Sequence, residues 1–185
     1  MTPLLVVGFL LSVLAGVARA EESALASLLK PLDLRGYTSP TTPPPFSGPT
    51  LDAQQLSMTA HRGTVVILNF WATWCVECRP EMAVFERLHR EFSSRQLTVI
   101  GVNAREKEDA IRRYATELGL SFPLVLDSDG KINALYGVVG LPTTFVVGRD
   151  GRAVAFAIGA RRWESAAGRA LIEALLAERA SQITR

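Results

Sequence analysis

The sequence predicts an α/β domain in which a central, mostly parallel sheet with an antiparallel hairpin is covered by helices on both faces. Strand-like and helix-like segments alternate along the chain in a β-α-β-α-β-α-β-β-α order. Short crossovers between buried strands require parallel neighbours and helices packed on the sheet. The first strand-like segment, residues 65–70, is a continuous apolar run of the kind found in strands buried on both faces.

Each later element is predicted by its own pattern. Apolar residues at spacings of three and four mark the helices, and short apolar runs between turn residues mark the strands. Gly119 fits the left-handed end of a helix, and Asp150-Gly151 fits a hairpin turn. In chain order we expect a helix over 75–92, a strand at 97–102, a helix over 111–118, a strand at 124–126, a helical piece over 131–136, strands at 143–147 and 153–158, and a helix over 163–179.

The first 45 residues are expected to lie outside the globular domain. Residues 4–17 are almost wholly apolar but short for a membrane-spanning helix, and Ala18-Arg19-Ala20 then fits a signal peptidase site. No Lys or Arg precedes Arg19, so the usual positive start of a signal peptide is missing and an uncleaved membrane anchor stays open. We expect a signal peptide or anchor at 1–20, a Pro-rich linker at 21–45 and the domain at 46–182.

Charge and composition exclude some classes of protein. The formal net charge is +2 and no basic cluster resembles a nucleic-acid footprint, so we expect no nucleic-acid partner. The hydrophobic content of 48% argues against a disordered chain.

The only two cysteines, Cys75 and Cys78, follow the apolar run at 65–70 after a turn of four residues. Their spacing places both side chains on one face of a helix, within reach of a disulfide. A pair that opens a helix also points its first thiol at unpaired backbone N–H groups, which stabilise a thiolate. The pattern therefore predicts a redox-active dithiol. Because Cys78 belongs to the apolar stripe of the helix, we expect Cys75 to attack and Cys78 to resolve.

Other uses of the cysteine pair are weaker. A structural disulfide closing so short a loop would stabilise the fold by only about 2 kcal/mol in the chain-entropy model. Structural zinc needs four ligands, and His61 and His89 are not at finger spacing. A Cu(I) metallochaperone remains the alternative function, because Met82 could join the two cysteines as a soft ligand. A peroxidase is disfavoured, since the chain has no Pro-x-x-x-Thr-x-x-Cys pattern.

Two motifs resemble those of the thioredoxin superfamily: Asn-Phe-Trp-Ala-Thr-Trp-Cys-Val-Glu-Cys-Arg-Pro-Glu at 69–81 and Gly-Leu-Pro-Thr-Thr-Phe at 140–145. Further segments resemble bacterial extracytoplasmic thiol-disulfide oxidoreductases of the TlpA/ResA type, namely Pro45-Phe46, Arg62-Gly63, the strand 99–103, Phe122-Pro123 and Asp129-Gly130-Lys131. The resemblance covers residues 44–180. It implies a thioredoxin fold with a central insertion and an N-terminal extension.

The same resemblance implies a function. Relatives of this type reduce Cys pairs of exported proteins, so the expected substrates include apocytochromes c and the copper-site cysteines of an oxidase subunit. A membrane thiol-transfer protein would supply the electrons, and no cofactor is required. The expected location is the periplasm or the extracytoplasmic face of the bacterial envelope, with residues 4–17 as a possible membrane tether.

Glu81 lies three residues beyond Cys78 on the expected helix and could carry its proton. Thioredoxins have a buried Asp at the position that matches Asn69, so the resemblance implies that this role has moved to Glu81. The alternative is a solvated acid that only complements the helix dipole. Pro80 is expected to distort a helix that starts at Cys75, because it removes an N–H in the second turn.

Three more residues are expected to contact the substrate. Leu141-Pro142 resembles the cis-proline loop of the superfamily, which implies a cis bond and strand-like pairing of the Leu141 backbone with a substrate. Trp74 is interpreted as a flat wall of the same site. Packing of Trp74 into the core is the alternative.

Overall fold

Six strands form one central sheet in the order β1-β8-β7-β4-β5-β6. The computed structural model describes residues 24–178. The strands of this sheet are β1 (Arg35–Thr41), β4 (Val65–Trp71), β5 (Leu97–Ala104), β6 (Leu124–Asp127), β7 (Thr143–Val147) and β8 (Ala153–Ile158). A small second sheet pairs β2 (Ser47–Pro49) with β3 (Gln55–Ser57).

Helices α2, α3 and α4 lie between these strands in the chain and α5 follows the last of them, mostly where the sequence predicts them. The α-helices are α2 (Cys78–Phe92), α3 (Glu108–Leu118), α4 (Lys131–Leu135) and α5 (Ala166–Ala177), residues 24–29 are helical, and the 3-10 turns are η1 (Lys30–Leu32), η2 (Met58–His61) and η3 (Ser93–Arg95). Gly119 ends α3 in the left-handed conformation, as expected. None of the helices within residues 24–178 is both long and apolar enough to span a bilayer.

The predicted α/β class is confirmed, but the sheet is mixed rather than mostly parallel. β4 pairs in parallel with β5, and β5 with β6. The pairs β4–β7, β7–β8 and β1–β8 are all antiparallel. An apolar run indicates that a strand is buried, but it does not indicate the direction of the strand. The antiparallel pairing of β7 with β4 therefore could not be predicted from the sequence pattern.

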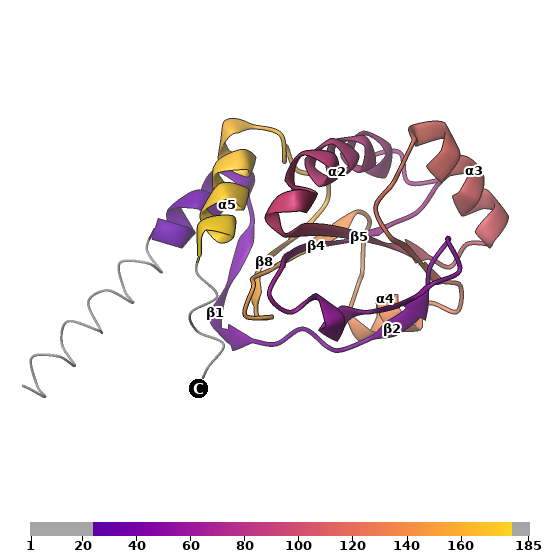
Figure 1. The fold of residues 1–185 in the computed structure, drawn as a ribbon, viewed down its shortest axis with the longest axis horizontal. Helices are drawn as coiled ribbons and strands as arrows, with labels where there is room; N and C mark the ends of the chain where they lie inside the picture. The colour runs from indigo at the N-terminus through magenta and orange to yellow at the C-terminus, as the bar shows by residue number, and fades with distance from the viewer. Residues whose placement is uncertain (1–23, 179–185) are drawn as a thin grey trace, which may run out of the picture.

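The two faces of the sheet carry different layers. Figure 1 shows α2 and α3 on one face and α4 with β2 on the other. The apolar side chains of α2, α3 and α5 pack with the odd-numbered residues of β4, such as Ile67 and Trp71. The even-numbered residues, such as Leu68, pack on the opposite side. This alternation places Asn69 on the α2 face of the strand.

The segment expected as a linker is folded with the domain from residue 24 onward, which corrects the boundary expected at Phe46. Leu29, Leu32 and Leu34 are buried in the core below α5, and β1 pairs with β8 at the edge of the sheet. Proline is tolerated in an edge strand, and the β1 register shifts between Gly36 and Thr41, around Pro40. Pro40 therefore marks an irregular edge strand. The signal peptide or anchor expected at 1–20 lies outside the described residues.

Candidate functional site

Cys75 and Cys78 form a disulfide at the carboxyl end of β4, with their Cα atoms 5.3 Å apart. β4 ends at Trp71, and the chain turns through Ala72–Glu77 before α2 begins at Cys78. The backbone N–H of Cys78 donates to the Sγ of Cys75 over 3.2 Å. The first amide of the helix is therefore aimed at the sulfur that was expected to be the nucleophile.

The two sulfurs differ in access. Cys75 is 8% exposed and Cys78 is fully buried. A partner can thus reach Cys75 first, which agrees with the order of attack predicted from the helical stripe.

The helix starts at Cys78 and not at Cys75, so the distortion expected at Pro80 has no cause. Pro80 is the third residue of α2. The first N–H groups of a helix have no partner within it, and a proline there removes no hydrogen bond.

Two large apolar side chains beside Cys75 are exposed. Trp74 is 67% exposed and Val76 is 85% exposed. The alternative that Trp74 packs in the core is therefore wrong. Two large apolar side chains in water next to a redox pair offer a contact area for another protein.

The Leu141-Pro142 peptide bond is cis, as expected. Pro142 directly precedes β7, whose first residue, Thr143, pairs with Phe70 near the end of β4. The loop therefore lies at the same end of the sheet as the cysteines. Its shape is held by two hydrogen bonds, from the Thr143 hydroxyl to the Gly140 carbonyl over 2.7 Å and from the Gly159 N–H to the Pro142 carbonyl over 2.7 Å.

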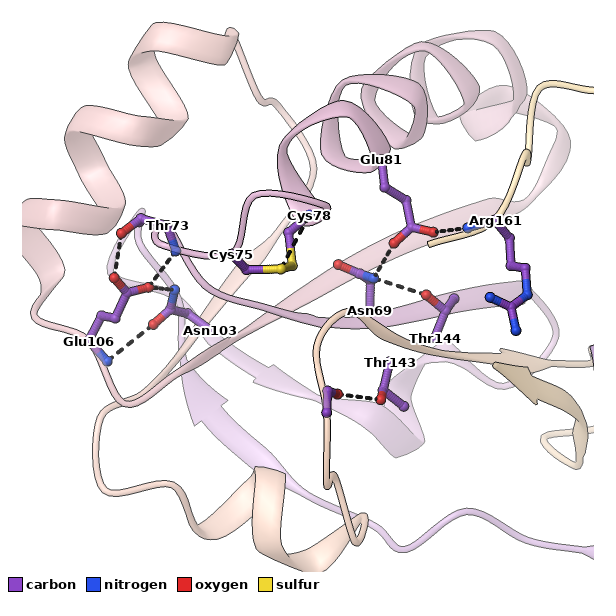
Figure 2. The surroundings of a disulfide bond; sticks show 11 residues. Asn69, Thr73, Cys75, Cys78, Glu81, Asn103, Glu106, Thr143, Thr144 and Arg161 are labelled. Carbon is purple, nitrogen blue, oxygen red and sulfur yellow. Dashed lines mark hydrogen bonds between the residues drawn. A yellow bond between two sulfur atoms is a disulfide. The ribbon is translucent and has the colours of Figure 1, made fainter. Parts of the chain in front are cut away.

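Glu81 is 3% exposed, so the alternative of a solvated helix-terminus acid is wrong. Its Oε1 accepts from the backbone N–H of Arg161 over 3.0 Å and from Trp163 Nε1 over 2.7 Å. Its Oε2 accepts from Asn69 Nδ2 over 3.2 Å. All three donors are neutral groups. Figure 2 shows the Asn69 side chain between the Glu81 carboxylate and the disulfide.

Burial raises the pKa of Glu81 from its ordinary value of 4.5 to about 7, and the hydrogen bonds from Arg161, Trp163 and Asn69 oppose the rise. A carboxyl group with this pKa is partly ionised at neutral pH. It can therefore take up or release a proton close to the redox pair.

A second polar cluster, which the sequence reasoning missed, holds the turn before Cys75. Glu106 accepts hydrogen bonds from the Thr73 N–H over 2.8 Å, from the Thr73 hydroxyl and from Asn103 Nδ2 over 2.7 Å. Asn103 lies near the carboxyl end of β5, directly beside Trp71 of β4 in the parallel register. A buried Asn near the end of an apolar strand was the available signal.

Met82 is fully buried in the core between α2 and the sheet. Among residues 24–178, no group of three or more His, Cys, Asp and Glu side chains is arranged to hold a metal ion. The fold and the site thus contain a thioredoxin-like dithiol with its cis-proline loop.

Known proteins are similar to this chain in sequence and in fold. The AhpC/TSA family model matches residues 41–155. The thiol-disulfide oxidoreductase ResA of Bacillus anthracis is 33% identical over 125 residues, which span 68% of this chain and 72% of that protein. The chain belongs to the AhpC/TSA family and, within it, to the ResA-like thiol-disulfide oxidoreductases.

Two further relatives agree with this assignment. The thioredoxin-like protein YneN of Bacillus subtilis is 40% identical over 111 residues, which span 58% of this chain and 64% of that protein. A crystal structure of a thiol:disulfide interchange protein of the thioredoxin family from Chlorobium tepidum superposes with a TM-score of 0.67 at 28% identity, covering 76% of this chain and 99% of the other. The predicted resemblance and the thioredoxin fold are confirmed.

Proposed function

We propose that this oxidoreductase works as a reductase of disulfides in exported proteins at the extracytoplasmic face of the bacterial envelope. The observation that carries the proposal is the arrangement of the pair. A slightly accessible Cys75 is bonded to a fully buried Cys78, and the residue before Cys75 is the exposed Trp74. Only a flexible protein segment or a small disulfide can reach such a sulfur, and Trp74 favours the protein.

The reaction proceeds by two thiol-disulfide exchanges. The Cys75 thiolate attacks a substrate disulfide, a mixed disulfide forms, and the first substrate sulfur leaves and takes up a proton. Cys78 then loses its proton and attacks Cys75, and the second substrate sulfur leaves. The substrate has gained two electrons and two protons, and the enzyme holds the Cys75–Cys78 disulfide. A donor dithiol reduces that disulfide and restores the enzyme.

Glu81 is the proposed acceptor of the Cys78 proton. Cys78 is buried, and a buried thiol resists ionisation unless a base takes its proton. Glu81 lies one helical turn further along α2, and its raised pKa suits it to this task.

Cysteine variants test the order of attack. Cys78→Ser should accumulate a mixed disulfide with its partner through Cys75, and Cys75→Ser should neither turn over nor trap. Trapping through Cys78 alone would contradict the assignment. Proteins captured by Cys78→Ser in the native host test the substrate class, for which we propose apocytochromes c or the copper-site cysteines of an oxidase.

Direction and location have their own measurements. A reduction potential well below that of the oxidants of the envelope supports a reductase fed by a membrane thiol-transfer protein, and a potential above −150 mV, on the order of that of a strong oxidant, would contradict it. Mass spectrometry of the protein from its host tests whether the mature chain begins at Glu21. A full-length mass in the membrane fraction would establish a tether through residues 4–17 instead.

A further inference from the structure

Asn69 is the one residue of β4 that is neither apolar nor aromatic, and its side chain is 1% exposed. A buried amide is costly unless its donors and acceptor are paired, with a penalty for each unpaired group. Its partners therefore indicate what the amide is for.

Only one end of the Asn69 amide is paired. Nδ2 donates to Glu81 Oε2 over 3.2 Å and to Thr144 Oγ1 over 2.9 Å, so both of its hydrogens are used. Oδ1 is buried and has no hydrogen-bond partner within residues 24–178. Thr144 lies opposite Asn69 in the antiparallel register of β4 and β7.

Glu81 fixes this orientation of the amide. Its Oε1 already accepts from Arg161 and Trp163, so Oε2 is the atom that faces Asn69. In its ionised form, which prevails above pH 7, the carboxylate only accepts hydrogen bonds and therefore faces the Nδ2 end. Figure 2 shows the consequence, in which Oδ1 lies on the side of the disulfide.

We propose that Asn69 is a positioning residue for the reduced enzyme, and that its Oδ1 accepts the hydrogen bond of the Cys78 thiol. The disulfide carries no hydrogen and cannot satisfy this oxygen. Reduction by a donor dithiol breaks the Cys75–Cys78 bond, turns the donor's thiols into a disulfide, and leaves a proton on Cys78. That S–H group is a donor in a site that water does not reach, because Cys78 is fully buried.

The proposed bond exists only in the reduced state, and it therefore shifts the redox equilibrium. It stabilises the dithiol relative to the disulfide, in which Oδ1 is unpaired. It also favours the protonated form of Cys78, because an amide oxygen can accept from the thiol and cannot donate to the thiolate. The inference rests on the dithiol chemistry of this site, and not on the proposed direction of electron flow or the proposed substrates.

Infrared spectroscopy of a single-thiol variant tests the bond directly. The chain has two cysteines, so Cys75→Ser leaves Cys78 as its only thiol. The S–H stretching band of this variant should lie at the lower frequency of a hydrogen-bonded thiol. Adding Asn69→Leu should move the band to the free-thiol position. A free-thiol band in Cys75→Ser itself overturns the proposal without any substitution at Asn69.

The redox equilibrium with glutathione is the second measurement. Asn69→Leu should move it about five- to tenfold toward the disulfide, which corresponds to a potential up to about 30 mV lower. Thr144→Val is the matched control, because it removes the other buried partner of Nδ2 and leaves Oδ1 in place. It should change the equilibrium less than about twofold. Equal shifts in both variants would reduce Asn69 to a structural role and overturn the proposal.

The variant Glu81→Gln provides a third test of the proposed hydrogen bond. Oε1 of Glu81 accepts twice, so the Gln oxygen must take that place and the Gln amide nitrogen must face Asn69. Two donors cannot pair, and the Asn69 amide should turn so that Oδ1 faces the Gln. The Cys78 band in Cys75→Ser with Glu81→Gln should then lie at the free-thiol position. An unchanged hydrogen-bonded band would show that Oδ1 is not the acceptor.

Discussion

Asn69 with Glu81 and Asn103 with Glu106 flank the disulfide on opposite sides, and both pairs join a buried Asn of a central strand to a carboxylate (Figure 2). The difference lies in what else each carboxylate contacts. Glu106 is half-buried and binds the turn before the cysteines through the N–H and hydroxyl of Thr73. Glu81 is buried and binds Arg161 and Trp163 from the segment after β8.

The contrast shows how similar residues are given different tasks. Both oxygens of Glu106 are used to hold the redox turn against β5, and both polar atoms of Asn103 are paired. Around Glu81, burial raises the pKa and one atom of Asn69 is left unpaired. We therefore assign a positioning role to Glu106 with Asn103, and we propose proton chemistry for Glu81.

The largest expected effect that separates the pairs is the pH dependence of stability. The pKa of Glu81 is raised to about 7 in the folded disulfide form, so folding favours the protonated acid. Its contribution to stability is fully present below pH 4.5, the ordinary pKa, and is lost as the pH rises through 7. The free energy of unfolding should fall by about 3 kcal/mol from this group.

Urea unfolding of the oxidised protein from pH 4 to pH 8 measures this loss. In Glu81→Gln the loss should disappear, and in Glu106→Gln it should remain. A pH dependence that is the same in wild type and Glu81→Gln would show that Glu81 titrates normally and would remove the basis for its proton role.

The next effect concerns catalysis. Glu81→Gln should slow the reduction of a protein disulfide about 100-fold at neutral pH, because the buried Cys78 loses its base. The deficit should narrow at high pH, where the thiol ionises unaided. Stopped-flow kinetics from pH 5 to pH 9 measure it, with Glu106→Gln as the control that keeps the wild-type shape of the profile. Matching profiles for Glu81→Gln and wild type would exclude Glu81 as the base.

Glu106 should matter for stability more than for the pH profile. Glu106→Ala leaves the Thr73 N–H and the Asn103 amide without their acceptor, and we expect a loss of about 2 kcal/mol. Glu108→Ala is the control, because its ion pair with Arg112 is exposed and should contribute less than about 1 kcal/mol. Chemical denaturation compares the two variants. Equal losses would show that Glu106 does not hold the redox turn.

The two pairs also show which features of the site could be predicted from the sequence. The spacing of three residues between Cys78 and Glu81 places both on one helix, and this spacing predicted the candidate role of Glu81. The burial of Glu81 could not be predicted, because it depends on Trp163 and Arg161, which are distant in sequence and contact Glu81 only in the folded chain. Glu106 was missed since its partner Thr73 belongs to another loop.

The same division applies to the fold. Strands and helices followed from local apolar patterns, and their boundaries mostly agree with the structure. The direction of the strands could not be predicted from these patterns, because β7 runs antiparallel to its neighbour β4. The edge strand β1 was hidden by Pro40, and only its pairing with β8 shows that it belongs to the sheet. A local apolar pattern does not show which strands pair when they are far apart in the sequence.

The smallest expected effect concerns Trp74. It tests whether the dithiol that these two pairs flank acts on a protein substrate. It is 67% exposed, so Trp74→Ala should not change the free energy of unfolding. An aromatic ring that becomes buried against a bound polypeptide contributes a large contact area, and its loss should raise KM for a protein disulfide about tenfold. A small disulfide that does not touch the ring should react as before.

Leu135→Ala is the matched control for Trp74. Leu135 is also exposed, at 50%, but lies on α4, on the opposite face of the sheet from α2. Its replacement should leave both KM values unchanged. If Trp74→Ala slows the small and the protein disulfide equally, the ring shapes the reactivity of Cys75 and does not bind substrate. If neither reaction changes, the apolar surface beside Cys75 is not the contact area, and the substrate must approach from the side of the Leu141-Pro142 loop alone.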